Sequence, residues 1–352
     1  MRILRLYTRL PPMQGGMENH IANLTKEQID FGHEVTIYFN LGNKVSQNDV
    51  RLTQFPLSKL KPQFLGILFY YFLTYLRLIF NSRKFDLVHI HGDWSSLVFS
   101  RLIKKIVRAQ KLCFTVHDEL SSNRLSQKAL FVLIKHVDII FVTGHAIADQ
   151  LKKITNKEII IQPSGVNDIF FKKRERIFNR RPFKIIIASS LVKKKNLGLV
   201  LDIAKDLRQL NFIVVGAGPE KKYLENRIQF ENIDNVEMLG FKTANELHFL
   251  YYEADIFLIT SLREGTPTAM LEAMACGLPV VTSGAGGVKK ILKDTNYIVD
   301  NNDKKNYVNF ILELVNDNTQ MRKISTNNEL LSRSFSWKNT AKTIETYIVE
   351  DL

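Results

Sequence analysis

Short apolar, β-branched segments alternate with longer amphipathic segments along the whole chain. Runs such as KLCFTV at 111–116 and KIIIA at 184–188 are bounded by polar or glycine-containing stretches. Buried parallel strands show this nearly continuous apolar pattern because helices cover both faces of their sheet. The alternation therefore predicts an α/β fold built on doubly wound parallel sheets.

We predict five strands in each half of the chain. In the first half they are residues 2–7, 34–39, 86–89, 111–116 and 139–142, and in the second half 184–188, 211–215, 236–238, 256–259 and 279–282. The polar, proline-punctuated stretch 163–182 separates the two sets, and 352 residues suffice for two domains. We expect an N-terminal domain over 1–165 and a C-terminal domain over 166–335, with a last helix, 336–352, that can return to the first domain. Ligands of such sheets bind beyond the carboxyl ends of the strands, so a cleft between the domains is the expected site.

Net charge narrows the possible partners. The chain carries +14, with 22 Lys and Arg against 13 Asp and Glu in residues 1–170 and 27 against 22 in the rest. A basic surface suits nucleic acid, an anionic membrane or phosphorylated substrates. No basic block with interleaved aromatic residues occurs, so we do not expect nucleic acid.

The cysteines and the first residues of the chain indicate the cellular compartment in which we expect the protein. Cys113 and Cys276 are far apart, which excludes a disulfide framework and favours a reducing compartment. Charges recur through the first residues, so we expect no signal peptide and a cytoplasmic protein.

The most informative segment is 260–283, which follows a predicted strand. We expect its helix to begin with Thr266 as N-cap and Pro267 at the first helical position. A helix N-terminus offers unpaired N–H groups and partial positive charge, both of which suit a diphosphate. Gly265 lets the backbone approach a ligand closely. Glu264 lies in the same loop.

Glu272 lies further along this helix, on the face of Thr268. A carboxylate at such a position can accept hydrogen bonds from a ribose diol. For either glutamate alone, the simpler interpretation is a dipole complement or a solvated helix charge. Gly-Thr-Pro before the helix and Gly-Leu-Pro-Val-Val after it make the pair of glutamates a more specific indication of a binding site.

The stretch from Glu264 to Val280 resembles the signature of the family 4 glycosyltransferases, E-G-x-P-x-x-x-x-E-A-M-A-x-G-x-P-V. These are retaining enzymes of GT-B architecture, with two Rossmann-like domains facing a central cleft. The resemblance implies that Glu264 contacts the donor sugar and that Glu272 binds the nucleotide ribose. It also implies a nucleoside-diphosphate sugar as donor and no cofactor, and among such donors we favour a UDP-sugar.

Further motifs extend the resemblance over most of the chain. Gly15 and Gly16 match the family's first-strand loop, G-G-x-E-x-H, whose N–H groups can face a phosphate. His117 follows a strand end where the family has a histidine beside donor sugar and acceptor. Lys195 matches the lysine of G-R-L-x-x-x-K, and Phe241 falls in a segment that walls the nucleotide base. We take His89 as structural and place His91 nearer the cleft.

Ser189 and Ser190 stand where the family has Gly-Arg. This departure removes one phosphate-binding arginine. It therefore keeps open the alternative that the chain is a non-catalytic subunit that binds sugar nucleotides. A dinucleotide-dependent oxidoreductase is the other alternative, but Lys221 occupies the third glycine position of G-x-G-x-x-G. No Asp-x-Asp, His-x-x-x-His or Cys-x-x-Cys occurs, so we predict no metal site. The interpretation that we prefer is a retaining, metal-independent transferase of a hexose-type sugar to an acceptor hydroxyl.

Residues 64–80 are almost entirely apolar or aromatic, apart from Thr74 and Arg77. One interpretation is a helix buried against the sheet. The other is a helix lying in the surface of an anionic membrane, on the inner face, aided by basic residues around 101–111. The second would suit a glycan or lipid-linked acceptor, as in the assembly of cell-envelope polysaccharides or glycolipids.

Overall fold

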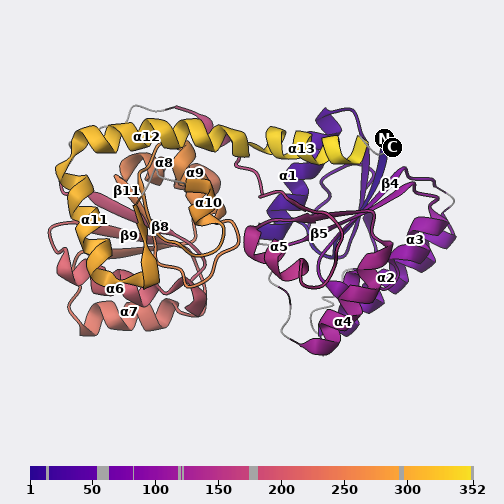
Figure 1. Ribbon diagram of the computed structural model, residues 1–352, viewed down its shortest axis with the longest axis horizontal. Helices are drawn as coiled ribbons and strands as arrows, with labels where there is room; N and C mark the ends of the chain where they lie inside the picture. The colour runs from indigo at the N-terminus through magenta and orange to yellow at the C-terminus, as the bar shows by residue number, and fades with distance from the viewer. Residues whose placement is uncertain are drawn as a thin grey trace. The chain divides into compact units, whose positions relative to one another are not determined.

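A computed structural model of the chain describes residues 1–12, 16–53, 63–81, 83–117, 120, 123–173, 181–292 and 297–349. The chain divides into two compact units (Figure 1). The first comprises Met1–Gly165 and Trp337–Leu352, and the second comprises Val166–Ser336. Each unit contains its own parallel sheet with helices packed on it, as the hydrophobic pattern predicts.

The first sheet has seven parallel strands in the order β3-β2-β1-β4-β5-β6-β7. Its strands are β1 (Arg2–Leu6), β2 (Glu34–Phe39), β3 (Val50–Arg51), β4 (Leu87–His91), β5 (Lys111–Val116), β6 (Ile139–Val142) and β7 (Ile159–Ile161). All five predicted strands are present, although β4 runs two residues further than predicted. The short edge strands β3 and β7 were not predicted. From β1 the chain builds first to one side and then, from β4, to the other, so the topological switch lies between these two strands.

In the described part of the first unit, α-helices pack with this sheet, and the last helix of the chain joins them. They are α1 (Gly16–Asp30), α2 (Gln63–Ile79), α3 (Ser100–Ile106), α4 (Arg124–Leu133), α5 (His145–Leu151) and α13 (Trp337–Val349). Figure 1 shows α13 lying along α1. Glu345 of α13 accepts hydrogen bonds from Gln28 Nε2 at 2.8 Å and from His33 Nε2 at 2.7 Å. Gln28 also accepts a hydrogen bond from the fully buried Arg5, so α13 is tied to the core of the first unit.

The second sheet has six parallel strands in the order β10-β9-β8-β11-β12-β13. They are β8 (Lys184–Ala188), β9 (Asn211–Val215), β10 (Val236–Gly240), β11 (Ile256–Ile259), β12 (Val280–Ser283) and β13 (Tyr297–Val299). Only β13 was not predicted, since three residues carry little periodicity. The switch point here lies between β8 and β11.

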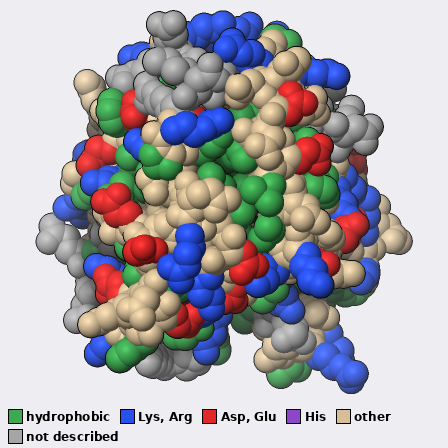
Figure 2. Space-filling model, turned by 90° about the vertical axis from the view of Figure 1, so that its left-hand side faces the viewer, with side chains coloured by type: hydrophobic (Ala, Val, Ile, Leu, Met, Phe, Trp, Pro, Cys, Tyr) green, Lys and Arg blue, Asp and Glu red, His purple; other side chains and the backbone are tan. Residues whose placement is uncertain are grey.

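Helices of the second unit are α6 (Leu197–Asp206), α7 (Lys221–Phe230), α8 (Ala244–Glu253), α9 (Thr268–Ala275), α10 (Val288–Leu292), α11 (Lys304–Asn316) and α12 (Asn318–Ser332). Apolar side chains of β8 pack into a buried cluster on each face of the sheet. Figure 2 shows one face of the molecule, where basic and acidic side chains are interspersed. Ion pairs such as Arg227–Asp202, at 2.8 Å, join α7 to α6.

Candidate functional site

The loops that follow β8 and β11 meet at the switch point of the second sheet. The N–H of Leu262 donates to the carbonyl of Lys194 at 2.8 Å. The hydroxyl of Thr260 lies 3.1 Å from the carbonyl oxygens of both Lys195 and Asn196. Two segments about 65 residues apart in sequence are therefore held together at the edge of the sheet where ligands bind.

Glu264 and Lys195 form the centre of this edge. Nζ of Lys195 lies 2.5 Å from Oε1 of Glu264, and the hydroxyl of Ser261 donates to the same oxygen at 2.6 Å. Glu264 is 9% exposed. Lys193 and Lys194 are exposed, so Lys195 alone of this lysine run turns toward the glutamate. The structure thus brings together two residues that the sequence motifs indicated separately.

A third loop, after β12, closes on the first two. The N–H of Gly287 donates to the carbonyl of Gly265 at 3.2 Å. Gly286 has φ of +67°, and a Cβ at this position would lie 2.0 Å from the carbonyl oxygen of Glu264. Only glycine fits here without displacing the Glu264 loop.

The start of α9 differs from the sequence prediction by one residue. Thr266 is not the N-cap: Pro267 takes that position with extended backbone (φ −71°, ψ 102°), and Thr268 begins the helix. The reason is that the carbonyl of Pro267 accepts the first hydrogen bonds, from Met270 and Leu271. Within the described part of the chain, the buried hydroxyl of Thr266 has no hydrogen-bond partner.

Glu272 and Phe241 occupy different environments in the same unit. Glu272 lies on α9, and burial raises the pKa of its carboxyl to about 7. Phe241 follows β10 and is 55% exposed, so it is not a core residue.

The glycines of the Gly-x-Gly-Pro turn after β9 pack against the loop that follows β8. A Cβ on Gly216 would lie 1.8 Å from the carbonyl oxygen of Ser189, and one on Gly218 would lie 2.4 Å from that of Leu191. Contact with protein backbone therefore accounts for both glycines. Ser190, in the same loop, is exposed.

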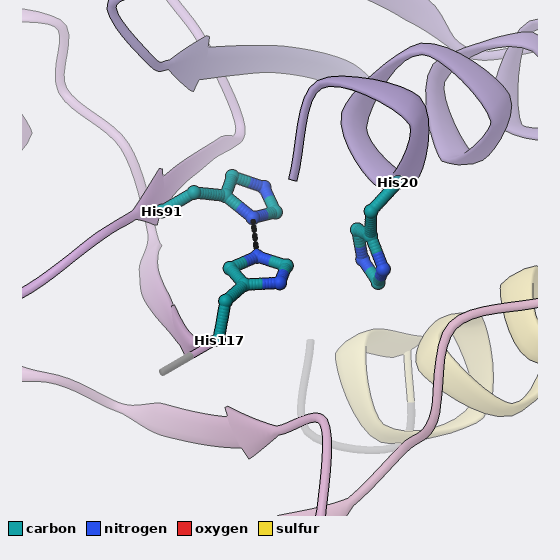
Figure 3. Close-up of side chains that lie close together, drawn as sticks. All are labelled: His20, His91 and His117. Carbon is teal, nitrogen blue, oxygen red and sulfur yellow. Dashed lines mark hydrogen bonds between the residues drawn. The ribbon is translucent and has the colours of Figure 1, made fainter. Parts of the chain in front are cut away.

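In the first unit, three histidines gather at the switch point of the sheet (Figure 3). His117 follows β5, His91 ends β4 and His20 lies on α1. Nδ1 of His91 and Nε2 of His117 are 3.0 Å apart and share a hydrogen bond. Gly16 is the first residue of α1, whereas Gly15 lies outside the described residues.

Burial sets the charge of this group of histidines. It lowers the pKa of His20 and of His91 well below the usual range, and that of His117 to about 3. All three rings are therefore neutral near pH 7. His89 lies behind them, fully buried, with Nε2 2.8 Å from the hydroxyl of Thr115. No local motif links His20 to the other two, so the group was not predicted from the sequence.

Two family models together match almost the whole chain. One, described as Glycosyltransferase Family 4, matches residues 14–169, and the other, Glycosyl transferases group 1, matches residues 168–330. The chain belongs to the family 4 glycosyltransferases. The residues matched by the two family models include the first-strand loop, the loop of Lys195 and the stretch that contains both glutamates.

Curated relatives include subunits of phosphatidylinositol N-acetylglucosaminyltransferase. One component of the human phosphatidylinositol N-acetylglucosaminyltransferase is 27% identical over 310 residues. That alignment covers 82% of this glycosyltransferase and 63% of the human protein, so the chain spans less than two thirds of that relative. The gpi3 component of the same enzyme from Schizosaccharomyces pombe is 23% identical, with 95% of this chain and 77% of the relative covered.

Solved structures show that the transferase has the GT-B fold. Anabaena HepE in complex with UDP has a TM-score of 0.81 and 18% identity, with 99% of this chain and 100% of HepE covered. Sucrose-phosphate synthase from Thermosynechococcus elongatus has a TM-score of 0.80 and 17% identity, with 99% and 98% covered. Within the described residues, no helix combines the length and apolarity needed to cross a membrane.

Proposed function

We propose that this glycosyltransferase moves a hexose-type sugar from a nucleoside-diphosphate sugar to an acceptor hydroxyl, with retention of configuration. The contact between Lys195 and Glu264 at the switch point of the second sheet carries the proposal. It places a cation and a carboxylate side by side, next to the N-terminus of α9. A donor presents the matching groups, an anionic diphosphate and a sugar rich in hydroxyls.

The chemistry follows from where charge develops. When the bond between sugar and diphosphate breaks, negative charge grows on the diphosphate. Lys195 and the N–H groups at the start of α9 supply positive charge that is already in position. Glu264 then accepts hydrogen bonds from the sugar, and Glu272 from the ribose diol. Phe241 remains the residue proposed to flank the base.

His117 is the catalytic residue that we propose in the first unit. Its neutral ring cannot supply a strong acid, but it can accept or donate a hydrogen bond to a sugar or acceptor hydroxyl. In a retaining reaction of this type, the departing diphosphate takes the proton of the acceptor hydroxyl. No separate strong base is then required.

Two comparisons favour particular substrates. HepE, which shares the fold, has been solved with UDP, so UDP is the nucleotide that we propose. The names of the curated relatives refer to transfer of N-acetylglucosamine to phosphatidylinositol. These names favour a lipid-linked acceptor over a free glycan.

The exposed apolar side chains of helix α2 support the proposal that the protein acts at an anionic membrane surface. One face is buried through Tyr70, Tyr71 and Leu78, while Phe69 and Phe72 on the other face are 46% and 41% exposed. The buried face agrees with the first interpretation of this segment, and the exposed apolar face supports the second. Further exposed apolar side chains lie on α3, which contacts α2, and on α4, including Leu102, Phe131 and Val132.

The competing function is a non-catalytic protein that binds sugar nucleotides without transferring sugar. The relatives are themselves described as parts of a larger enzyme, and Ser190 replaces a phosphate-binding arginine. Mixing the protein with a UDP-sugar and a lipid-linked acceptor separates the two functions. An enzyme releases UDP in proportion to the acceptor consumed, whereas a non-catalytic protein binds the donor and releases none.

A further inference from the structure

The three gathered histidines of the first unit have the composition of a metal site, although no metal-ligand motif in the sequence predicted one. His20, His91 and His117 each offer one nitrogen, and these atoms all lie within 4.8 Å of one another. Figure 3 shows the rings of His91 and His117 facing each other, with His20 reaching toward them from α1. We propose that these three imidazoles bind a divalent transition-metal ion of the zinc class, with one ion per chain.

The spacing is close to what such an ion requires. Zinc–nitrogen bonds of about 2.0–2.1 Å in a tetrahedral site hold the ligand nitrogens about 3.3 Å apart. Nδ1 of His91 and Nε2 of His117 are 3.0 Å apart. The ring centroids of His20 and His117 are 4.7 Å apart. The ligand nitrogens of the three residues lie within 4.8 Å of one another, so binding requires the nitrogen of His20 to move closer to the other two.

Hydrogen bonding prepares His20 for this role. Its Nδ1 lies 2.8 Å from the hydroxyl of Ser164. A histidine that binds metal usually donates its other ring N–H to an oxygen acceptor, which fixes the tautomer, and the hydroxyl oxygen of Ser164 can accept this hydrogen bond. Nε2 of His20 is fully buried, and so is Nε2 of His91, and neither has a hydrogen-bond partner among the described residues. Burial of unpaired polar atoms costs free energy, which a bound ion would offset at His20.

The chemistry of the ligands selects the class of ion. Imidazole nitrogens suit zinc, copper, nickel and cobalt, whereas calcium and magnesium prefer oxygen. Neutral rings can bind without losing a proton to solvent, because each needs only the appropriate tautomer. His117 is the only partly exposed member of the three, so water or an anionic oxygen can complete the coordination on its side.

A metal ion bound at this site would inhibit sugar transfer. It would occupy a ring nitrogen of His117, the residue to which the proposed function assigns contact with the substrate. This consequence rests on the proposed function, but binding itself does not. We therefore expect zinc to inhibit the enzyme and not to activate it.

The test is a titration of the purified full-length chain with Co²⁺ and, separately, Zn²⁺. We expect one ion per chain, a visible Co²⁺ spectrum typical of tetrahedral nitrogen ligands, and competition by Zn²⁺. His91→Gln and His117→Gln should each raise the Kd at least tenfold. His136→Gln is the matched control, since His136 is exposed and outside the group of three. Thermal unfolding without metal checks that each variant is folded.

Two results would overturn the proposal. One is a wild-type chain that gives no Co²⁺ spectrum and no heat of binding with Zn²⁺. The other is folded His91→Gln and His117→Gln variants that bind as tightly as wild type. If zinc binds as expected but leaves sugar transfer unchanged, the metal site stands and the role proposed for His117 is wrong.

Discussion

Nζ of Lys195 lies 2.5 Å from Oε1 of Glu264, although 69 positions separate the two residues. The contact joins the loop after β8 to the loop after β11, across the switch point of the second sheet. Each side chain is paired with an opposite charge. Binding of a diphosphate would then draw Lys195 toward its oxygens and release Glu264 for the sugar.

Lys195→Ala should therefore lower turnover by more than tenfold, which corresponds to about 1.4 kcal/mol of transition-state stabilisation. Lys194→Ala is the matched control because Lys194 is a neighbouring exposed lysine whose contact to Leu262 uses only its backbone. Release of nucleoside diphosphate measures both variants. Wild-type turnover in Lys195→Ala would remove Lys195 from the site.

Glu272 gives a pH dependence whose sign can be worked out. Burial raises its pKa from 4.5 to about 7, so the unfolded chain loses this proton first as pH rises. The free energy of unfolding of the nucleotide-free protein should therefore fall between about pH 4.5 and pH 7. Glu272→Gln resembles the protonated form, so we expect this variant to melt at a higher temperature than wild type at pH 8.

Nucleotide binding should respond in the opposite sense. A ribose diol donates to the ionised carboxylate, so the affinity of wild type for UDP, relative to Glu272→Gln, should rise between pH 6 and pH 8. The ratio of the two proteins' affinities for UDP cancels the effect of the titration of the phosphate itself. Calorimetry at both pH values measures it, and a ratio that does not change would place Glu272 outside the ribose site.

Gly286→Ala should disrupt donor binding without general unfolding. The added Cβ would lie 2.0 Å from the carbonyl oxygen of Glu264, so this loop must move. Gly32→Ala is the control, because Gly32 also has a positive φ, of +85°, but has no atom within 4 Å of the added carbon. Both variants carry left-handed backbone strain of about 1–2 kcal/mol, and only Gly286→Ala should lose more than tenfold in affinity for UDP. Equal affinities in the two variants would contradict the packing argument.

Metal removal should not abolish sugar transfer. The proposed donor site uses Lys195 and the N-terminus of α9 as its positive charges, so activity should survive excess EDTA. Initial rates before and after chelation provide the measurement. Loss of activity that manganese alone restores would show that the reaction depends on metal.

Membrane attachment can be tested with vesicles. We expect the protein to sediment with anionic vesicles but not with neutral ones, and salt to weaken the association. Replacing the exposed Arg101 and Lys105 by Ser should cost about 1 kcal/mol per charge. This pair is preferable to Lys104, which lies 2.6 Å from Asp138, and to Arg108, whose φ is +55°. Lys152 and Lys153, also exposed, give a control with the same loss of charge. If wild type stays in the supernatant at low salt, a soluble acceptor becomes the better proposal.

The sequence by itself determined the fold class, ten of the strands and the family. These depend on local information: apolar runs typical of buried strands, and a motif whose residues lie close together in the chain. Glu264 to Val280 spans one loop, one helix and the next strand, so its resemblance to the family could be recognised before the structure. Short segments such as β3 and β13 lack enough residues for a pattern, and their place depends on pairing with a neighbouring strand.

Only the tertiary structure decided which side chains meet. Parallel strands bring their carboxyl ends to one edge, so Lys195 meets Glu264, and His20, His91 and His117 gather in the first unit. No spacing in the sequence encodes these contacts, because crossover helices of varying length separate the strands. The structure also moved the start of α9 by one residue, to Thr268, because hydrogen bonding to the carbonyl of Pro267, and not residue preference, sets where the helix begins.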